Sequence, residues 1–114
     1  MKVREVIAYK NYFISFLKEQ DKKVQNKIYK VIEIIETFQR IPKTYLSPVI
    51  GEKGLYYARI KLGSNIWRVF CFFDEGKLVI LLNAFTKKTQ KTPKKEIKKA
   101  KRLMKEYYIE KNSK

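Results

Sequence analysis

The chain has 114 residues, which is the length of one domain, and we expect residues 1–114 to form a single unit. Its 27 Lys and Arg against 11 acidic residues give a formal net charge of +16, which predicts a polyanionic partner, RNA in the first place. The 45% of apolar residues exclude a disordered tail, the lack of His excludes histidine-based catalysis, and the single Cys excludes an internal disulfide.

The first half of the chain predicts one strand and two helices. Residues 2–8 are rich in Val and Ile, as strands are. Asn11 can cap a short helix, and Asp21 can cap a longer one that ends near Phe38. Apolar residues recur in the longer helix at intervals of three and four, up to Phe38, which is typical of a helix that buries one stripe. We expect a helical hairpin, followed by a connector over residues 40–53.

Three strands are expected in the second half. Residues 55–62 and 66–73 alternate between two faces, and residues 77–85 are apolar on both faces, as in the middle of a sheet. Gly63 begins a turn between the first two strands, and Gly76 supplies the positive φ of a tight hairpin before the third. The three strands therefore predict a mainly antiparallel sheet.

A basic helix is expected at the end of the chain. Thr92 can cap it, Pro93 suits its first position, and its pattern runs to about Tyr108. Residues 87–114 hold twelve bases and three acids, so much of the positive charge lies here. The predicted fold is α+β in the order β-α-α-β-β-β-α, a mostly antiparallel small sheet with an N-terminal helical hairpin packed on one face and a basic C-terminal helix.

Membrane insertion and thiol chemistry are both disfavoured. The longest aliphatic stretch, residues 78–82, is far too short to span a bilayer, and we expect a cytoplasmic protein. Cys71 lies in an apolar run, where a core thiol is the natural interpretation. Asp74 and Glu75 are adjacent carboxylates at an expected hairpin tip, so neither a metal site nor a cofactor is predicted.

A basic patch is predicted on one face of the sheet. Alternation places Arg59 and Lys61 on the same face, and the simplest hairpin register adds Arg68. Lys87 and Lys88 follow the third strand and could reach the rim of this face. Arginines bind phosphate oxygens and remain charged, and a lysine crowded by cations has a lowered pKa, which suits proton transfer.

Aromatic residues are interleaved with these cations. Tyr57 shares the predicted face, and so do Phe70 and Phe72. Aromatic rings stack on unpaired bases, so this composition is the one that an RNA surface needs. The alternative for Phe70 and Phe72 is burial beneath the C-terminal helix, which we consider the more frequent outcome for such residues.

Three segments resemble a known family. Residues 54–60, 67–70 and 81–93 are similar to the HigB-type branch of the RelE/ParE toxin superfamily, a pattern that the phage-derived host-inhibition proteins share. The specific part is the run Phe-Thr-Lys-Lys-Thr-Gln-Lys-Thr-Pro at residues 85–93. Ala58 departs from the pattern, since relatives commonly carry Glu before the strand arginine.

The resemblance implies the toxin of a type II toxin–antitoxin pair, an endoribonuclease that cleaves messenger RNA without a metal, often on the ribosome. A small helix-turn-helix antitoxin of the HigA type would neutralise it. The catalytic positions carried over by motif are Arg59, Arg68, Lys87 and Lys88. The two arginines would hold the scissile phosphate, and a lysine would transfer protons. The positions assigned to RNA binding are Lys61 and Tyr57, which rest on the strand-face argument and not on the motif, and Lys91.

Two other functions remain open from the sequence. A ParE-like gyrase inhibitor would share the fold and would damage DNA without cutting RNA. A non-catalytic nucleic-acid-binding module would bind RNA with a steep salt dependence and leave it intact. The fate of transcripts after induction distinguishes these functions from RNA cleavage.

Overall fold

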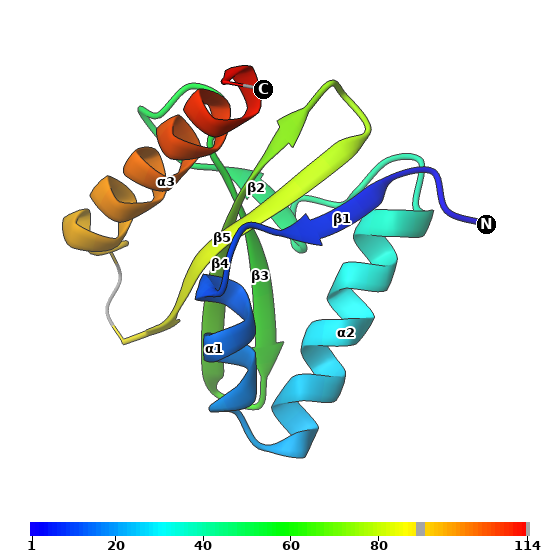
Figure 1. The fold of residues 1–114 in the computed structure, drawn as a ribbon. Coiled ribbons are helices and arrows are strands. Elements are labelled where there is room, and N and C mark those ends of the chain that lie inside the picture. Colours follow the sequence, from blue (N-terminus) through cyan, green and yellow to red (C-terminus); the bar gives the residue numbers. More distant parts are fainter. Residues whose placement is uncertain (89–90, 114) are drawn as a thin grey trace.

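The order of elements matches the predicted order except for one additional short strand (Figure 1). In the computed structural model, which describes residues 1–88 and 91–113, the elements are β1 (Glu5–Ala8), α1 (Tyr12–Lys18), α2 (Lys22–Thr37), β2 (Leu46–Pro48), β3 (Tyr56–Leu62), β4 (Asn65–Asp74), β5 (Leu78–Lys87) and α3 (Lys94–Asn112). The prediction that residues 40–53 form only a connector is wrong, because β2 lies within them. β2 pairs with β3 at the edge of the sheet, where Pro48 can be accommodated.

The five strands of the described chain form one mixed sheet in the order β1-β5-β4-β3-β2. β1 is parallel to β5, and the other neighbouring pairs are antiparallel. β5 lies between β1 and β4, which explains why it is apolar on both faces. The positive φ of Gly76 in the hairpin before β5, expected from the sequence, is confirmed.

Helices α1 and α2 cover one face of the sheet. The Asp21 carboxylate caps α2 and accepts a hydrogen bond of 3.0 Å from the backbone N–H of Val24. Asn11 occupies the N-cap position of α1 but makes no side-chain capping bond, so that part of the prediction is wrong. Phe38 is also wrongly placed in the buried stripe, since its backbone has already left the helix and the side chain is 46% exposed.

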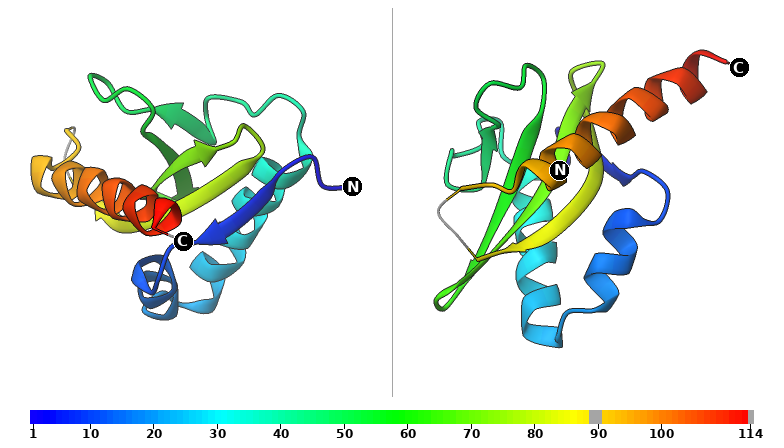
Figure 2. Two further views of the ribbon diagram at one scale, coloured as in Figure 1. Left: turned by 45° about the horizontal axis from the view of Figure 1, so that its top comes forward. Right: turned by 90° about the vertical axis from the view of Figure 1, so that its left-hand side faces the viewer.

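Helix α3 covers part of the opposite face (Figure 2). Its buried residues, Ala100 and Leu103, belong to the same core cluster as Phe70 and Phe72. Pro93 is the N-cap rather than the first helical residue, so the helix begins one position later than predicted. Within the described residues, no helix has both the length and the apolar character needed to cross a membrane.

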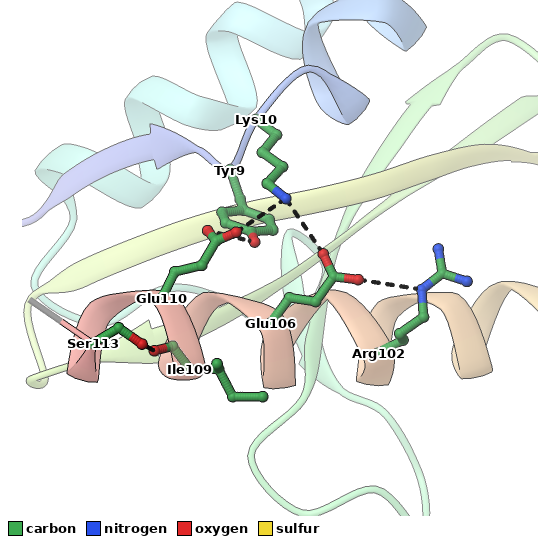
Figure 3. Close-up of polar contacts among 7 residues, drawn as sticks. All are labelled: Tyr9, Lys10, Arg102, Glu106, Ile109, Glu110 and Ser113. Carbon is green, nitrogen blue, oxygen red and sulfur yellow. Dashed lines mark hydrogen bonds and ion pairs between the residues drawn. The ribbon is translucent and has the colours of Figure 1, made fainter.

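Ion pairs and hydrogen bonds fasten the C-terminal half of α3 to the rest of the domain. Lys10 lies 3.1 Å from Glu110 and 3.5 Å from Glu106, and the Tyr9 hydroxyl donates to Glu110 (Figure 3). These contacts join α3 to the segment between β1 and α1. We call these contacts, the ion pair of Arg102 with Glu106 at 3.6 Å and the Asp74 group described next the α3 anchor.

The Asp74 group lies at the end of β4. Its carboxylate is buried, at 3% exposure, and accepts hydrogen bonds from the Tyr107 hydroxyl at 2.7 Å and from Lys111 at 2.8 Å. These bonds hold the pKa of Asp74 below its usual range, with Lys111 the larger cause. Burial, reinforced by the bond to Asp74, raises the pKa of Tyr107 to about 12.

Candidate nucleic-acid interface

The sheet register places three cations on one face. Arg59 lies directly opposite Arg68 in the β3–β4 ladder, and Lys87 lies opposite Ile66, two residues before Arg68. Because residues paired across strands point to the same face, Arg59, Arg68 and Lys87 share a face. The predicted register of Arg59 and Arg68 is therefore confirmed. We call these three residues the cationic cluster.

The cationic cluster has no acidic partner within the described chain: no carboxylate there forms an ion pair with Arg59, Arg68 or Lys87. The pKa of Lys87 is lowered, first by burial and then by the positive charges of Arg68 and Arg59. Arg68 and Arg59 are thus close enough to Lys87 for their positive charges to contribute to the shift. Such an arrangement attracts an anion that can neutralise it.

Arg68 is held in a fixed orientation. Its guanidinium carbon lies 4.2 Å from the centre of the Tyr57 ring, a cation–π contact. Its Nη1 donates a hydrogen bond to the Thr92 hydroxyl. Its Nε is buried and has no hydrogen-bond partner in the described part of the chain. The Tyr57 ring thus covers one face of the guanidinium, and Thr92 accepts from one of its nitrogens. Its other N–H groups can still donate to a phosphate.

Thr92 contacts the cationic cluster, which differs from the role that its place before Pro93 predicts. Its predicted role as helix cap is wrong, because Pro93 is the N-cap. A buried side chain, Asn83, ties the start of α3 to β5 through hydrogen bonds to the Glu96 backbone at 3.2 Å and the Glu96 carboxylate at 3.0 Å. The start of α3 is thus fixed beside the sheet, which brings Thr92 to Arg68 across 24 residues of sequence.

Most of the predicted residues line two separate hollows. Arg59 and Lys61 line a hollow of about 300 Å³, together with Lys27, Thr44 and Tyr45. Tyr57, Arg68 and Lys91 line a cavity of about 560 Å³. Lys88 is exposed directly after the end of β5. The expected patch therefore does not form a single pocket. Lys27, contributed by α2, was not among the predicted residues.

The aromatic part of the prediction requires a correction. Phe70 and Phe72 are 0% and 1% exposed, because α3 packs over them. They cannot stack on a base, so the alternative of burial beneath the C-terminal helix is the one that holds. Of the three predicted aromatic residues, Tyr57 alone is partly exposed, and its ring contacts Arg68.

Neither thiol nor metal chemistry is favoured by the described side chains. Cys71 is fully buried, and burial raises the pKa of its thiol to about 12, so it is not a nucleophile. In residues 1–88 and 91–113, no three His, Cys, Asp or Glu side chains gather as a metal site would require.

Comparison with known proteins shows the family of this chain and a solved structure with a similar fold. A family model described as "Phage derived protein Gp49-like" matches residues 15–105. Among solved structures, a chain of the archaeal RelE–RelB complex from Pyrococcus horikoshii OT3 is similar, with 20% sequence identity and a TM-score of 0.55. The match covers 74% of this chain and 94% of that chain. At this identity the likeness concerns the fold. No curated protein matches the chain.

Proposed function

This chain belongs to the Gp49-like family of phage-derived proteins, and from that premise we propose that it is the toxin of a type II toxin–antitoxin system. Its activity would be the cleavage of messenger RNA, as in the HigB-type branch that the sequence resembles. The observation that carries the proposal is the cationic cluster, in which two arginines and a lysine of lowered pKa face the same side of the sheet without an acidic partner in the described chain.

The cluster has the groups that metal-independent phosphodiester cleavage needs. In this reaction the 2′-oxygen of a ribose attacks the adjacent phosphorus and loses its proton, and the 5′-oxygen of the next nucleotide leaves and gains one. Arg59 and Arg68 would bind the phosphate oxygens, where negative charge increases in the transition state. The products are a 2′,3′-cyclic phosphate and a 5′-hydroxyl, so the step requires no water or cofactor.

Lys87 is the preferred residue for proton transfer. Its lowered pKa raises the fraction of neutral amine near neutral pH, and a neutral amine can accept the 2′-hydroxyl proton. The same group, once protonated, can donate to the leaving 5′-oxygen. Lys88 is exposed and adjacent in sequence, so it would serve as a secondary donor or would bind the RNA backbone, as Lys61 and Lys91 would.

The proposed partners follow from this function. The substrate would be messenger RNA, bound on the ribosome and therefore in the cytoplasm. A helix-turn-helix antitoxin of the HigA type would neutralise the protein. The similar archaeal structure is itself a complex of RelE with RelB, which makes a protein partner a reasonable expectation for a chain of this fold.

Induction in a bacterial host tests the proposal. Expression of the wild-type chain should arrest growth and produce new 5′-hydroxyl ends within transcripts, and the Arg68→Ala/Lys87→Ala variant should do neither. Lys30→Ala/Lys105→Ala is the matched control, because it also removes two positive charges, both of them on exposed helix positions. Thermal unfolding of each purified variant confirms that it is folded. Intact transcripts with a DNA-damage response would instead indicate a gyrase inhibitor, and undiminished toxicity of a folded double variant would exclude the assigned residues.

A further inference from the structure

The cavity beside Arg68 differs in character from the cationic cluster. It has a volume of about 560 Å³, within the range of roughly 300–1,000 Å³ typical of small-ligand sites. One wall comes from β2 and the residues after it, one from the start of α3, and the floor from the sheet. Its lining residues are Lys43, Ser47, Pro48, Val49, Ile50, Tyr57, Arg68, Lys91, Thr92 and Ile97.

The lining combines apolar walls with cations and hydroxyls. Val49 and Ile97 provide apolar surface, and Ile50 at the rim is 98% exposed. Ile50 therefore offers apolar surface at the rim that a bound ligand can cover. Among the described residues, no acidic side chain lines the cavity, whereas three basic side chains do. The apolar walls suit the face of a flat ring, and the hydroxyls suit its polar edge. The basic side chains suit an anionic chain to which that ring is attached.

Arg68 belongs to both the cavity and the cationic cluster. A phosphate bound by the cluster would therefore have the adjoining nucleoside at the mouth of the cavity. Resting on the proposed function, we propose that this cavity binds one unpaired nucleobase next to the scissile phosphate of a single-stranded RNA. A base in a duplex is stacked and paired, so the cavity selects single strands.

The competing occupant is an apolar side chain of a protein partner. The cavity disfavours it, because a neutral apolar side chain would leave the positive charges of Lys43 and Arg68 without compensation, whereas an RNA strand brings a phosphate with every base. The test separates the two occupants, since a protein-binding cavity would show no preference between RNA strands of equal charge.

The experiment compares two five-nucleotide strands with the same phosphates, one with all bases and one abasic. Both carry 2′-fluoro groups, which prevent attack by a 2′-hydroxyl and keep the strands intact. We expect the full-length protein to bind the base-bearing strand about tenfold more tightly, the size of effect that stacking one base provides. Ile50→Ser should remove most of this preference without weakening the abasic complex. It should not unfold the domain, because the Ile50 side chain is almost entirely open to solvent.

Ile109→Ser is the matched control, since Ile109 is also an exposed isoleucine, at 57%, but lies on the C-terminal half of α3. It should keep the tenfold preference. A second variant, Ser47→Leu, places bulk inside the cavity and should also remove the preference. Equal binding of the two strands by the wild-type protein would overturn the cavity proposal and leave RNA binding standing. Failure to bind either strand would overturn the cavity proposal and the direct binding of free RNA, whereas transcript cleavage after induction tests the proposed function separately.

Discussion

The cationic cluster and the α3 anchor differ in whether their positive side chains form ion pairs with carboxylates. In the anchor, Lys10 and Lys111 each pair with two carboxylates, and Arg102 pairs with Glu106. In the cluster, Arg59 and Arg68 face each other directly across two strands, and no described carboxylate forms an ion pair with either. In the described part of the chain, acidic residues therefore pair with cations where α3 is attached, and none forms an ion pair with the cluster.

This difference indicates which charges the fold needs. Like charges directly opposite in an antiparallel ladder are destabilising, so Arg59 and Arg68 oppose folding. Bonds to the buried Asp74, in contrast, stabilise the attachment of α3. Substitutions in the two regions should then have opposite consequences, with activity reduced in one and stability reduced in the other. The predictions below test that separation.

The largest effect is expected for Arg59→Gln. Removing one phosphate ligand should lower RNA cleavage, measured on translated transcripts, by about 100-fold. The free energy of unfolding should stay the same or rise by about 0.5 kcal/mol, because one of two facing like charges is removed. Arg102→Gln removes the same charge from the exposed surface of α3 and should retain activity. If Arg59→Gln lowered the free energy of unfolding as well as the activity, the two regions would not differ in the way described above.

Asp74→Ala should lower the free energy of unfolding by about 2 kcal/mol, because it removes the buried bonds to Tyr107 and Lys111. Urea denaturation measures this change. Glu75→Gln, which changes the exposed partner of Lys111, should have little effect. Since the pKa of Asp74 is lowered in the folded state, its contribution is present above the usual pKa of Asp and disappears as pH falls through the lowered value.

The Asp74→Ala protein should therefore show a shallower loss of stability in acid than the wild-type protein does. Equal acid sensitivity of the two proteins would show that Asp74 does not fasten α3.

A smaller effect is expected for Thr92→Val, which preserves shape and removes the oxygen that accepts from Arg68. Because one hydrogen bond orients the guanidinium, cleavage should fall about fivefold while the protein stays folded. Thr92→Ser restores the hydroxyl and should recover most of the activity. If Ser and Val variants were equally impaired, the role of Thr92 would lie in local packing and not in orienting Arg68.

The sequence was sufficient to predict the faces of the central strands. Alternation in β3 and β4 predicts which residues lie against α1 and α2 and which share a face with Arg68, and the core clusters agree with it. The capping position of Asp21 and the hairpin at Gly76 were also predictable, because each depends on a few neighbouring residues. These features are local, and local patterns determine them.

Interactions between distant segments were not predictable in this way. β2 has three residues in a connector with two prolines, too few for a periodic signal, and becomes a strand because β3 offers an open edge. The bond between Arg68 and Thr92 depends on where α3 begins beside the sheet. The two hollows depend on how that connector lies near α2 and α3.

The salt dependence of binding to single-stranded RNA tests the central claim most directly. Arg59→Gln/Arg68→Gln removes two charges from the cationic cluster, and Lys10→Gln/Arg102→Gln removes two from the α3 anchor. We predict that the slope of log affinity against log salt becomes shallower by about 1.4 for the cluster variant, at roughly 0.7 for each phosphate that the variant no longer neutralises, and is unchanged for the anchor variant. Equal slopes for the two variants would contradict the conclusion that the unpaired cations of the sheet bind the RNA backbone.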